Sequence, residues 1–178
     1  MRVHTQRRTM RNAAVSTLCA LLLAACGASP ESMVTSAKEY LAKNDRNAAS
    51  IQLKNALQKN DKLAEARFLL GKINLEQGDY AGAEKELNRA LDAGYSPDEV
   101  VPLLGRALLA SGQSDKIAEL ASRQLTQPEA RAAVLALQGF GQLTKGRRDE
   151  AAASFNSALR EAPAQPLARA GLARLRAI

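Results

Sequence analysis

Apolar residues recur at intervals of three and four along most of the chain, the spacing that places them on one face of an α-helix. The pattern is clearest in residues 64–97, where two amphipathic stretches are separated by Gln77, Gly78 and Asp79. Glycine takes the positive φ that a tight turn between helices requires. The segment is therefore predicted to form two helices folded back on each other.

This pattern repeats with a period of 34 residues. The small residue Gly71 recurs as Gly105 and Gly139, and the turn residue Gly78 recurs as Gly112 and Gly146. Several positions that recur with the same 34-residue period favour a repeat architecture over the alternative, a plain helical bundle rich in Ala and Leu. Further positions in register are Ala37 and Ala173 for the small residue, Asn44 for the turn, and Leu57, Leu91, Leu125 and Leu159 in the second helices.

A helix-turn-helix unit of about 34 residues resembles the tetratricopeptide repeat. Arg67 stands where that family often has Trp. The resemblance implies an all-α fold, a helix-turn-helix solenoid (α–α superhelix) of about four and a half repeats after an N-terminal signal segment. The array spans 31–178, with repeats at about 30–63, 64–97, 98–131 and 132–165, and a partial or capping unit at 166–178. A truncated longer array is the favoured interpretation of that last unit, because Ala173 keeps the register.

The third repeat departs most from the pattern. Pro102 lies beyond the first turn of its first helix and has no N–H to donate, which predicts a kink or a helix start delayed towards Val100. The second helix is expected over 115–125, with Ile117 replacing a small residue. Loose packing is expected here.

Residues 1–25 are predicted to be a lipoprotein signal peptide. Four arginines precede a short apolar run that ends in Leu23, Ala24, Ala25 and Cys26, which resembles a bacterial lipobox. That resemblance implies lipidation of Cys26, with residues 26–30 as the tether. By the same resemblance, a residue other than Asp at position 27 implies that the lipoprotein is sorted to the periplasmic face of the outer membrane. An ordinary signal peptide or an uncleaved anchor are the alternatives, and general secretion is favoured over twin-arginine export.

Charge and composition exclude several functions. The four arginines before Cys26 account for part of the net charge of +7, so the mature chain is near +3, and nucleic-acid binding is not expected. The only cysteines are Cys19 and Cys26 and the only histidine is His4, which leaves no mature disulfide, zinc site or Cys-His or Ser-His catalytic pair. No enzyme activity, cofactor, metal or small-molecule substrate is expected. The acidic pairs Asp149–Glu150 and Glu84–Glu86 are interpreted as solvated helix faces.

Segments 37–60 and 94–104, close after a lipobox, are similar to the N-terminal part of the tetratricopeptide-repeat lipoprotein of the PEP-CTERM/exosortase system. That resemblance implies a membrane-anchored scaffold for periplasmic protein partners, linked to envelope protein sorting or exopolysaccharide export. Members of that family are longer arrays. The alternative is a lipoprotein that assists assembly of a type IV pilus, a secretin or outer-membrane proteins. A carbohydrate-binding module is disfavoured by an aromatic content of 3%.

In the tetratricopeptide family the first helices line the concave face, so the resemblance implies a groove with three sets of side chains. An apolar strip would run between a cationic and an acidic column, and would dock a peptide bearing acidic groups. Solvated or mutually paired charges are the alternative. The sets are Lys38, Lys72, Arg106, Phe140 and Arg174 for the cationic column, which Phe140 interrupts; Glu31, Glu65 and Glu99 for the acidic one; and Leu41, Leu75, Leu109 and Leu143 for the strip.

Overall fold

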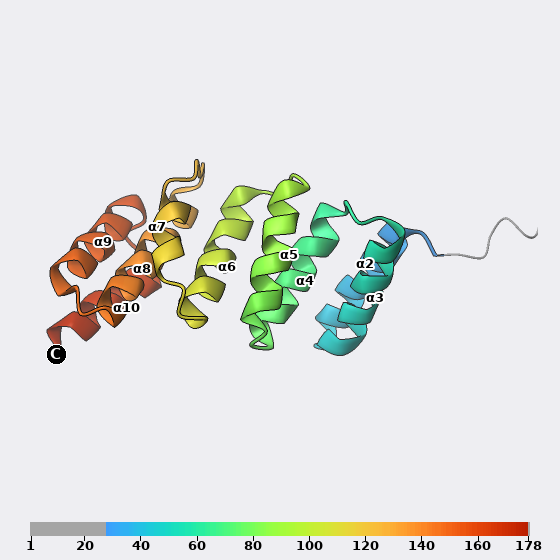
Figure 1. Cartoon of the computed structure of the whole chain (residues 1–178), viewed down its shortest axis with the longest axis horizontal. Helices are drawn as coiled ribbons and strands as arrows, with labels where there is room; N and C mark the ends of the chain where they lie inside the picture. Colours follow the sequence, from blue (N-terminus) through green and yellow to red (C-terminus); the bar gives the residue numbers. More distant parts are fainter. Residues whose placement is uncertain (1–27, 178) are drawn as a thin grey trace, which may run out of the picture.

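The computed structural model describes residues 28–177, which fold into nine α-helices and no strand. They form an elongated row from α2 to α10, which confirms the predicted helical solenoid (Figure 1). The predicted leader and Cys26 lie outside the described residues. The helices are α2 (Pro30–Ala42), α3 (Arg46–Lys59), α4 (Ala64–Glu76), α5 (Tyr80–Asp92), α6 (Pro97–Ala110), α7 (Asp115–Ala121), α8 (Pro128–Thr144), α9 (Arg148–Glu161) and α10 (Pro166–Arg176).

The described helices form two layers. In Figure 1, α3, α5, α7 and α9 lie in front, and α2, α4, α6, α8 and α10 lie behind them. Each helix packs against the next one in the chain, and α6–α8 and α8–α10 also pack within the rear layer. We call the surface formed by α2, α4, α6, α8 and α10 the first-helix face. Because each pair buries its apolar side against its neighbours, the core extends along the whole row.

Turns between paired helices recur in one conformation. Gly78, Gly112 and Gly146 have φ of 82°, 77° and 73°, and Asn44 has φ of 61° at the matching place in the first repeat. Asn is among the few residues other than Gly that adopt this region readily. The sequence register of the turns is therefore confirmed.

Small residues allow the paired helices to approach closely. A Cβ added at Gly71 would lie 2.8 Å from Cγ of Leu87, and one added at Gly139 would lie 2.6 Å from Cε1 of Phe155. Both partners lie 16 residues after their glycine, on the second helix of the same pair. In α10 the buried small residues are Ala168 and Gly171, and a Cβ added at Gly171 would also meet Phe155, whereas Ala173 is exposed.

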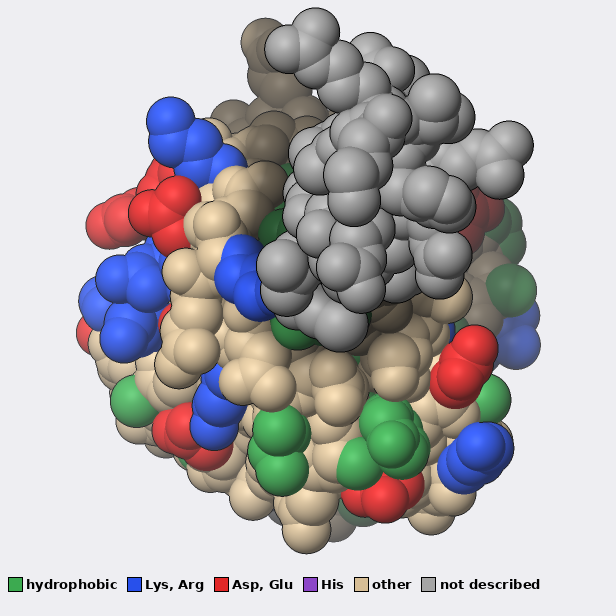
Figure 2. Space-filling model, turned by 90° about the vertical axis from the view of Figure 1, so that its right-hand side faces the viewer, with side chains coloured by type: hydrophobic (Ala, Val, Ile, Leu, Met, Phe, Trp, Pro, Cys, Tyr) green, Lys and Arg blue, Asp and Glu red, His purple; other side chains and the backbone are tan. Residues whose placement is uncertain are grey.

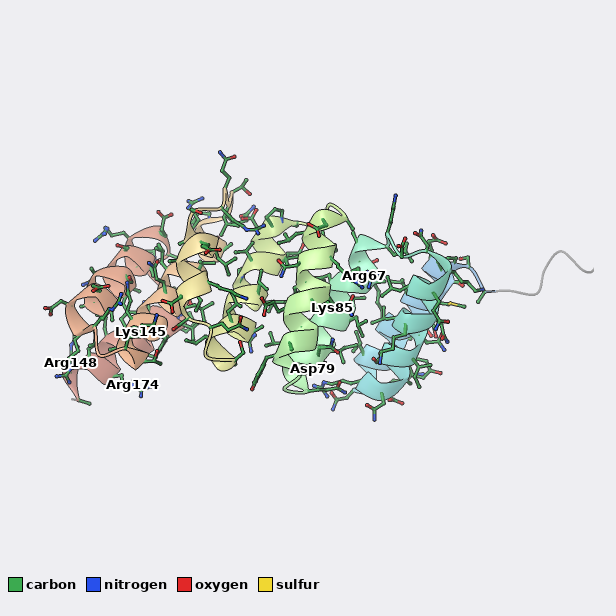
Figure 3. The ribbon with its side chains drawn as sticks, viewed as in Figure 1. Arg67, Asp79, Lys85, Lys145, Arg148 and Arg174 are labelled. Atoms are coloured by element: carbon green, nitrogen blue, oxygen red, sulfur yellow. The ribbon has the colours of Figure 1, made fainter. Side chains whose placement is uncertain are left out.

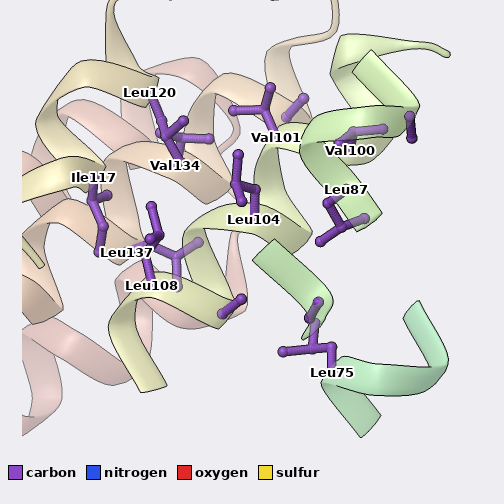
Figure 4. Packing of buried hydrophobic residues seen from close by; sticks show 14 of the residues in the cluster. Leu75, Leu87, Val100, Val101, Leu104, Leu108, Ile117, Leu120, Val134 and Leu137 are labelled. Carbon is purple, nitrogen blue, oxygen red and sulfur yellow. The ribbon is translucent and has the colours of Figure 1, made fainter. Parts of the chain in front are cut away.

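The core is divided into three clusters of buried apolar side chains that follow one another along the row. The middle cluster joins α6 to its neighbours (Figure 4). Val100 and Val101 on α6 are fully buried, as is Ile117 on α7. The third repeat is therefore well packed around α6, although α7 has only seven residues.

Two helix bounds expected in the third repeat, a start delayed towards Val100 and an end at Leu125, are wrong, whereas the alternative of a kink at Pro102 stays a prediction. Helix α6 begins at Pro97 and passes through Pro102, so its start is not delayed towards Val100. Val100 and Val101 are fully buried, and this burial offsets the hydrogen bond that Pro102 cannot make. Helix α7 ends at Ala121 and not at Leu125.

Contacts from α6 explain why the chain leaves the helix after Ala121. The Asp98 carboxylate accepts hydrogen bonds from the backbone N–H groups of Thr126 and Gln127, at 2.8 and 3.0 Å, and from the Thr126 hydroxyl at 2.5 Å. These bonds fix the backbone before α8, where Gln127 is extended with φ of −86° and ψ of 126°. The carbonyls of Leu125 and Thr126 accept from Arg131, both at 3.0 Å.

Hydrogen bonds from Gln127 and Thr126 hold the pKa of Asp98 below its ordinary value of 3.8. A carboxyl whose pKa is lower in the folded state stabilises the fold above its unfolded pKa, and this contribution is lost as the pH falls through the folded pKa. We expect Asp98→Asn to lower the melting temperature at pH 7 and to have a smaller effect below pH 3.8. Thermal unfolding of both proteins between pH 7 and pH 2.5 measures this. An equal difference at every pH would contradict the role of the charge.

Three arginines hold the loops between helix pairs by hydrogen bonds. Each is the fourth residue of a first helix, and each donates to the backbone carbonyl of the residue six positions earlier. The guanidinium thereby fixes the path of the chain into the helix. The pairs are Arg67 with Asp61 at 3.1 and 3.2 Å, Arg131 with Leu125 at 3.0 Å, and Arg169 with Pro163 at 2.8 and 3.2 Å. No arginine is fourth in α6, where Tyr95 instead stacks on Phe68 with ring centroids 4.3 Å apart.

Arg67 also pairs with Glu86 on α5, with Nη1 2.6 Å from Oε2. The side chains are only 12% and 9% exposed. The interpretation of Glu84–Glu86 as a solvated face is therefore wrong for Glu86. A buried ion pair therefore joins α4 to α5.

Candidate partner-binding face

The predicted cationic column lies on the first-helix face, but its members differ in surroundings. Lys38, Lys72, Arg106 and Arg174 are exposed on α2, α4, α6 and α10. Phe140 on α8 is partly buried and meets Phe155 edge to face, with ring centroids 5.1 Å apart. Its ring therefore contributes to the core between α8 and α9.

The acidic column is partly used within the chain. Glu65 on α4 forms an ion pair with Lys38 on α2, whereas Glu31 and Glu99 are exposed. Glu99 accepts a long hydrogen bond from the Tyr95 hydroxyl, at 3.5 Å. Burial, together with Glu99 and Glu65, raises the pKa of Tyr95. The alternative of mutually paired charges thus describes Lys38 and Glu65, and Lys72 and Arg106 form no ion pair within residues 28–177.

The predicted apolar strip is discontinuous. Leu75 is buried in the middle cluster, at 8% exposure. Leu41, Leu109 and Leu143 are partly buried, and each packs against a different core cluster. The strip therefore seals the core along the first-helix face and leaves only the edges of three leucines to a partner.

A hollow of about 170 Å³ lies between α2 and α4. Leu41, Leu69 and Ile73 form its apolar part. Arg46 and Glu76, which also line it, pair with each other at 2.7 Å. Lys72 also lines this hollow, and no acidic side chain of the described chain forms a salt bridge with it.

A second hollow, of about 430 Å³, lies between α6 and α8. Pro102, Ala130 and Ala133 supply its apolar surface. Glu99 and Glu129 also line it and form no salt bridge with a basic side chain of the described chain. Asp98 and Gln127 complete the lining. We define the α6–α8 hollow by these seven residues.

Sequence reasoning placed Glu99 on this face but missed the rest of the α6–α8 hollow. Helix α8 begins at Pro128, four residues before the repeat boundary placed at 132. This extra turn brings Glu129 and Ala130 alongside α6. The start of this repeat was expected between Pro128 and Ala132, and the proline, which is favoured at the first position of a helix, marks the observed start.

Three ion pairs between successive repeats lie at the edge that holds the turns, whereas Lys38 and Glu65 pair on the first-helix face. Arg46 pairs with Glu76 at 2.7 Å and Lys116 with Glu84 at 3.0 Å, and Lys145 pairs with Asp115. Figure 3 shows this edge at Asp79, opposite the edge near Arg67. Viewed from the α2 end, basic and acidic side chains are interspersed over the surface (Figure 2). Exposed pairs of this kind contribute about 0–1 kcal/mol each.

Within residues 28–177, no cluster of three or more His, Cys, Asp or Glu side chains is placed to hold a metal ion. None of the helices in that part of the chain is both long and apolar enough to cross a bilayer. The first-helix face offers charged side chains and small apolar surfaces.

Comparisons with known proteins agree with this geometry. Residues 34–98 match the tetratricopeptide repeat family. A solved structure from Pseudomonas aeruginosa, described as the functional characterization of pilF, superposes with a TM-score of 0.66 at 21% identity. It covers 82% of this chain, and this chain covers 67% of it. No curated protein sequence matches the chain.

Proposed function

We propose that this helical solenoid with tetratricopeptide repeats is a non-catalytic scaffold, which holds a segment of a protein partner on its first-helix face. The observation that carries the proposal is the pair of hollows on that face, one bearing Lys72 and the other bearing Glu99 and Glu129. These side chains form no salt bridge with the described chain, so their charges remain for a partner. Opposite charges on a partner would guide its docking and fix its register.

A photo-crosslinking amino acid at position 72 tests this proposal in cells that produce the protein. We expect Lys72 to be replaced without loss of the fold, since its side chain is exposed. Crosslinks to a distinct protein should form at position 72 and not at position 54, an exposed lysine on α3 in the other layer. Equal crosslinking at both positions, or none at 72, would contradict docking on the first-helix face.

The compartment proposed for this scaffold is the bacterial envelope, with a lipid on Cys26 and attachment to the periplasmic face of the outer membrane. The supporting observation is the lipobox-like sequence after a basic and apolar leader. The favoured role is protein sorting or exopolysaccharide export linked to a PEP-CTERM/exosortase system. The second candidate, assembly of a type IV pilus, a secretin or outer-membrane proteins, draws support from the likeness to pilF. The protein crosslinked at position 72 distinguishes the two.

Cys26→Ser is expected to abolish lipid attachment, because serine has no thiol to form the thioether. The variant should accumulate as an uncleaved precursor, lose incorporation of labelled fatty acid and leave the outer-membrane fraction. Cys19→Ser, in the apolar part of the leader, is the matched control and should be processed normally. Gel mobility and fatty-acid labelling measure both. Normal cleavage of a wild-type chain that carries no lipid would exclude this anchor.

A further inference from the structure

The α6–α8 hollow differs in charge from the rest of the first-helix face. Three carboxylates line it, from Asp98, Glu99 and Glu129, and no Lys or Arg does. Asp98 is engaged by the backbone at residues 126 and 127, whereas Glu129 has no hydrogen bond or salt bridge to the described chain, and Glu99 has only the long bond to Tyr95. The two glutamates therefore supply negative charge over an apolar surface.

That combination fits one kind of side chain. Lys and Arg carry three or four methylene groups that pack on apolar surface, and a cationic head that remains among polar groups. Pro102, Ala130 and Ala133 can contact the methylene groups, and Glu99 and Glu129 can accept hydrogen bonds from the head. An acidic or purely apolar side chain would leave the two carboxylates without a counter-charge.

The α2–α4 hollow has the opposite preference. Its Arg46 and Glu76 neutralise each other, and Lys72 remains to bind an acidic group. Two spacings between first helices separate the hollows, and helices pack about 8–10 Å apart. The hollows are therefore about 16–20 Å apart. An extended chain rises about 3.3 Å per residue, so about five or six residues bridge them.

We propose that the partner segment carries a Lys or Arg that occupies the α6–α8 hollow, and an Asp or Glu about five or six residues away that pairs with Lys72. This inference rests on the proposed function and specifies the charges of the bound segment and the spacing between them. Lys38 and Glu65 take no part, because they neutralise each other within the chain.

Random twelve-residue peptides displayed on phage test the inference against the immobilised full chain in mild detergent. Enriched peptides should combine a basic and an acidic residue at the stated spacing. Replacing the basic residue of such a peptide by Gln should weaken binding by about tenfold or more, and so should the double variant Glu99→Gln/Glu129→Gln. If the groups contact each other, the two changes together should cost little more than either alone.

The double variant Asp149→Asn/Glu150→Gln is the matched control. It also removes two exposed carboxylates from the first turn of a helix, but from α9 in the other layer. Its affinity should stay within about twofold of the wild-type value. Enriched peptides without the basic residue, or ones that bind the Glu99→Gln/Glu129→Gln variant equally well, would overturn the inference and leave the proposed function standing. A selection that yields no binder to the first-helix face would overturn the proposed function and the inference with it.

Discussion

Phe155→Ala is expected to destabilise the C-terminal end of the array more than any other single truncation, by about 3–5 kcal/mol. The Phe155 side chain is 0% exposed and lies at the centre of the cluster formed by α8, α9 and α10. Gly139 and Gly171 approach it from the two first helices that flank it. Alanine would leave a cavity that these glycines, which have no side chains, cannot fill.

Because repeat arrays unfold in part from their ends, a single melting temperature is not a sufficient measurement for this variant. Amide hydrogen exchange should show loss of protection in α8, α9 and α10, and near-normal protection in α2 to α5. Asn156→Ala changes the neighbouring exposed residue and should shift stability by less than about 0.5 kcal/mol. Unchanged protection in α10 after Phe155→Ala would contradict the proposed packing.

Glu86→Ala is expected to cost about 3 kcal/mol, because it leaves the Arg67 guanidinium buried without its counter-charge. Arg67 would keep its hydrogen bonds to the Asp61 carbonyl, and Arg89, whose Nη1 lies 3.8 Å from Glu86, would lose a weaker contact. Chemical denaturation, with circular dichroism of the helices as the signal, measures the loss.

A double variant separates the role of the charge from the role of packing. Arg67→Met/Glu86→Leu replaces both charges by apolar groups of similar size, and should recover most of the stability that Glu86→Ala loses. Glu84→Ala is the control on the same helix, since Glu84 is more exposed and pairs with Lys116 near the surface. If Glu84→Ala and Glu86→Ala cost the same, the ion pair of Arg67 is not the buried contact described above.

The sequence predicted those features that depend on short-range spacing. Gly71 and Gly139 occupy the same position of the 34-residue repeat, so a close approach of the paired helices at both glycines followed from the period. The end of α7 could not be predicted from the period. It depends on the Asp98 side chain, which binds the backbone of Thr126, 28 residues later, and so holds this loop outside the helix. Periodicity cannot reveal a hydrogen bond between distant positions.

The candidate site was predictable only in outline, for the same reason. The repeat register placed Lys72 and Glu99 on one face, and the structure shows both exposed there. Whether a charge is free or paired depends on side chains from the neighbouring repeat, as Lys38 and Glu65 show. The contribution of Glu129 depends on the extra turn of α8, which lies outside the repeat pattern.

The loop contacts of Arg67, Arg131 and Arg169 have a consequence for how such a chain can lengthen. Each contact joins two residues six positions apart, so the donor and the acceptor lie within one short stretch of sequence. A gene duplication that copies this stretch copies both the arginine and the carbonyl that accepts its hydrogen bond. The new repeat can then pack on its neighbour at the same angle without further substitutions. The Phe68–Tyr95 stack joins residues 27 positions apart, and a duplication whose boundary falls between them would separate the two rings. Repeats gained or lost during evolution are therefore expected to begin and end at the loops held by these arginines.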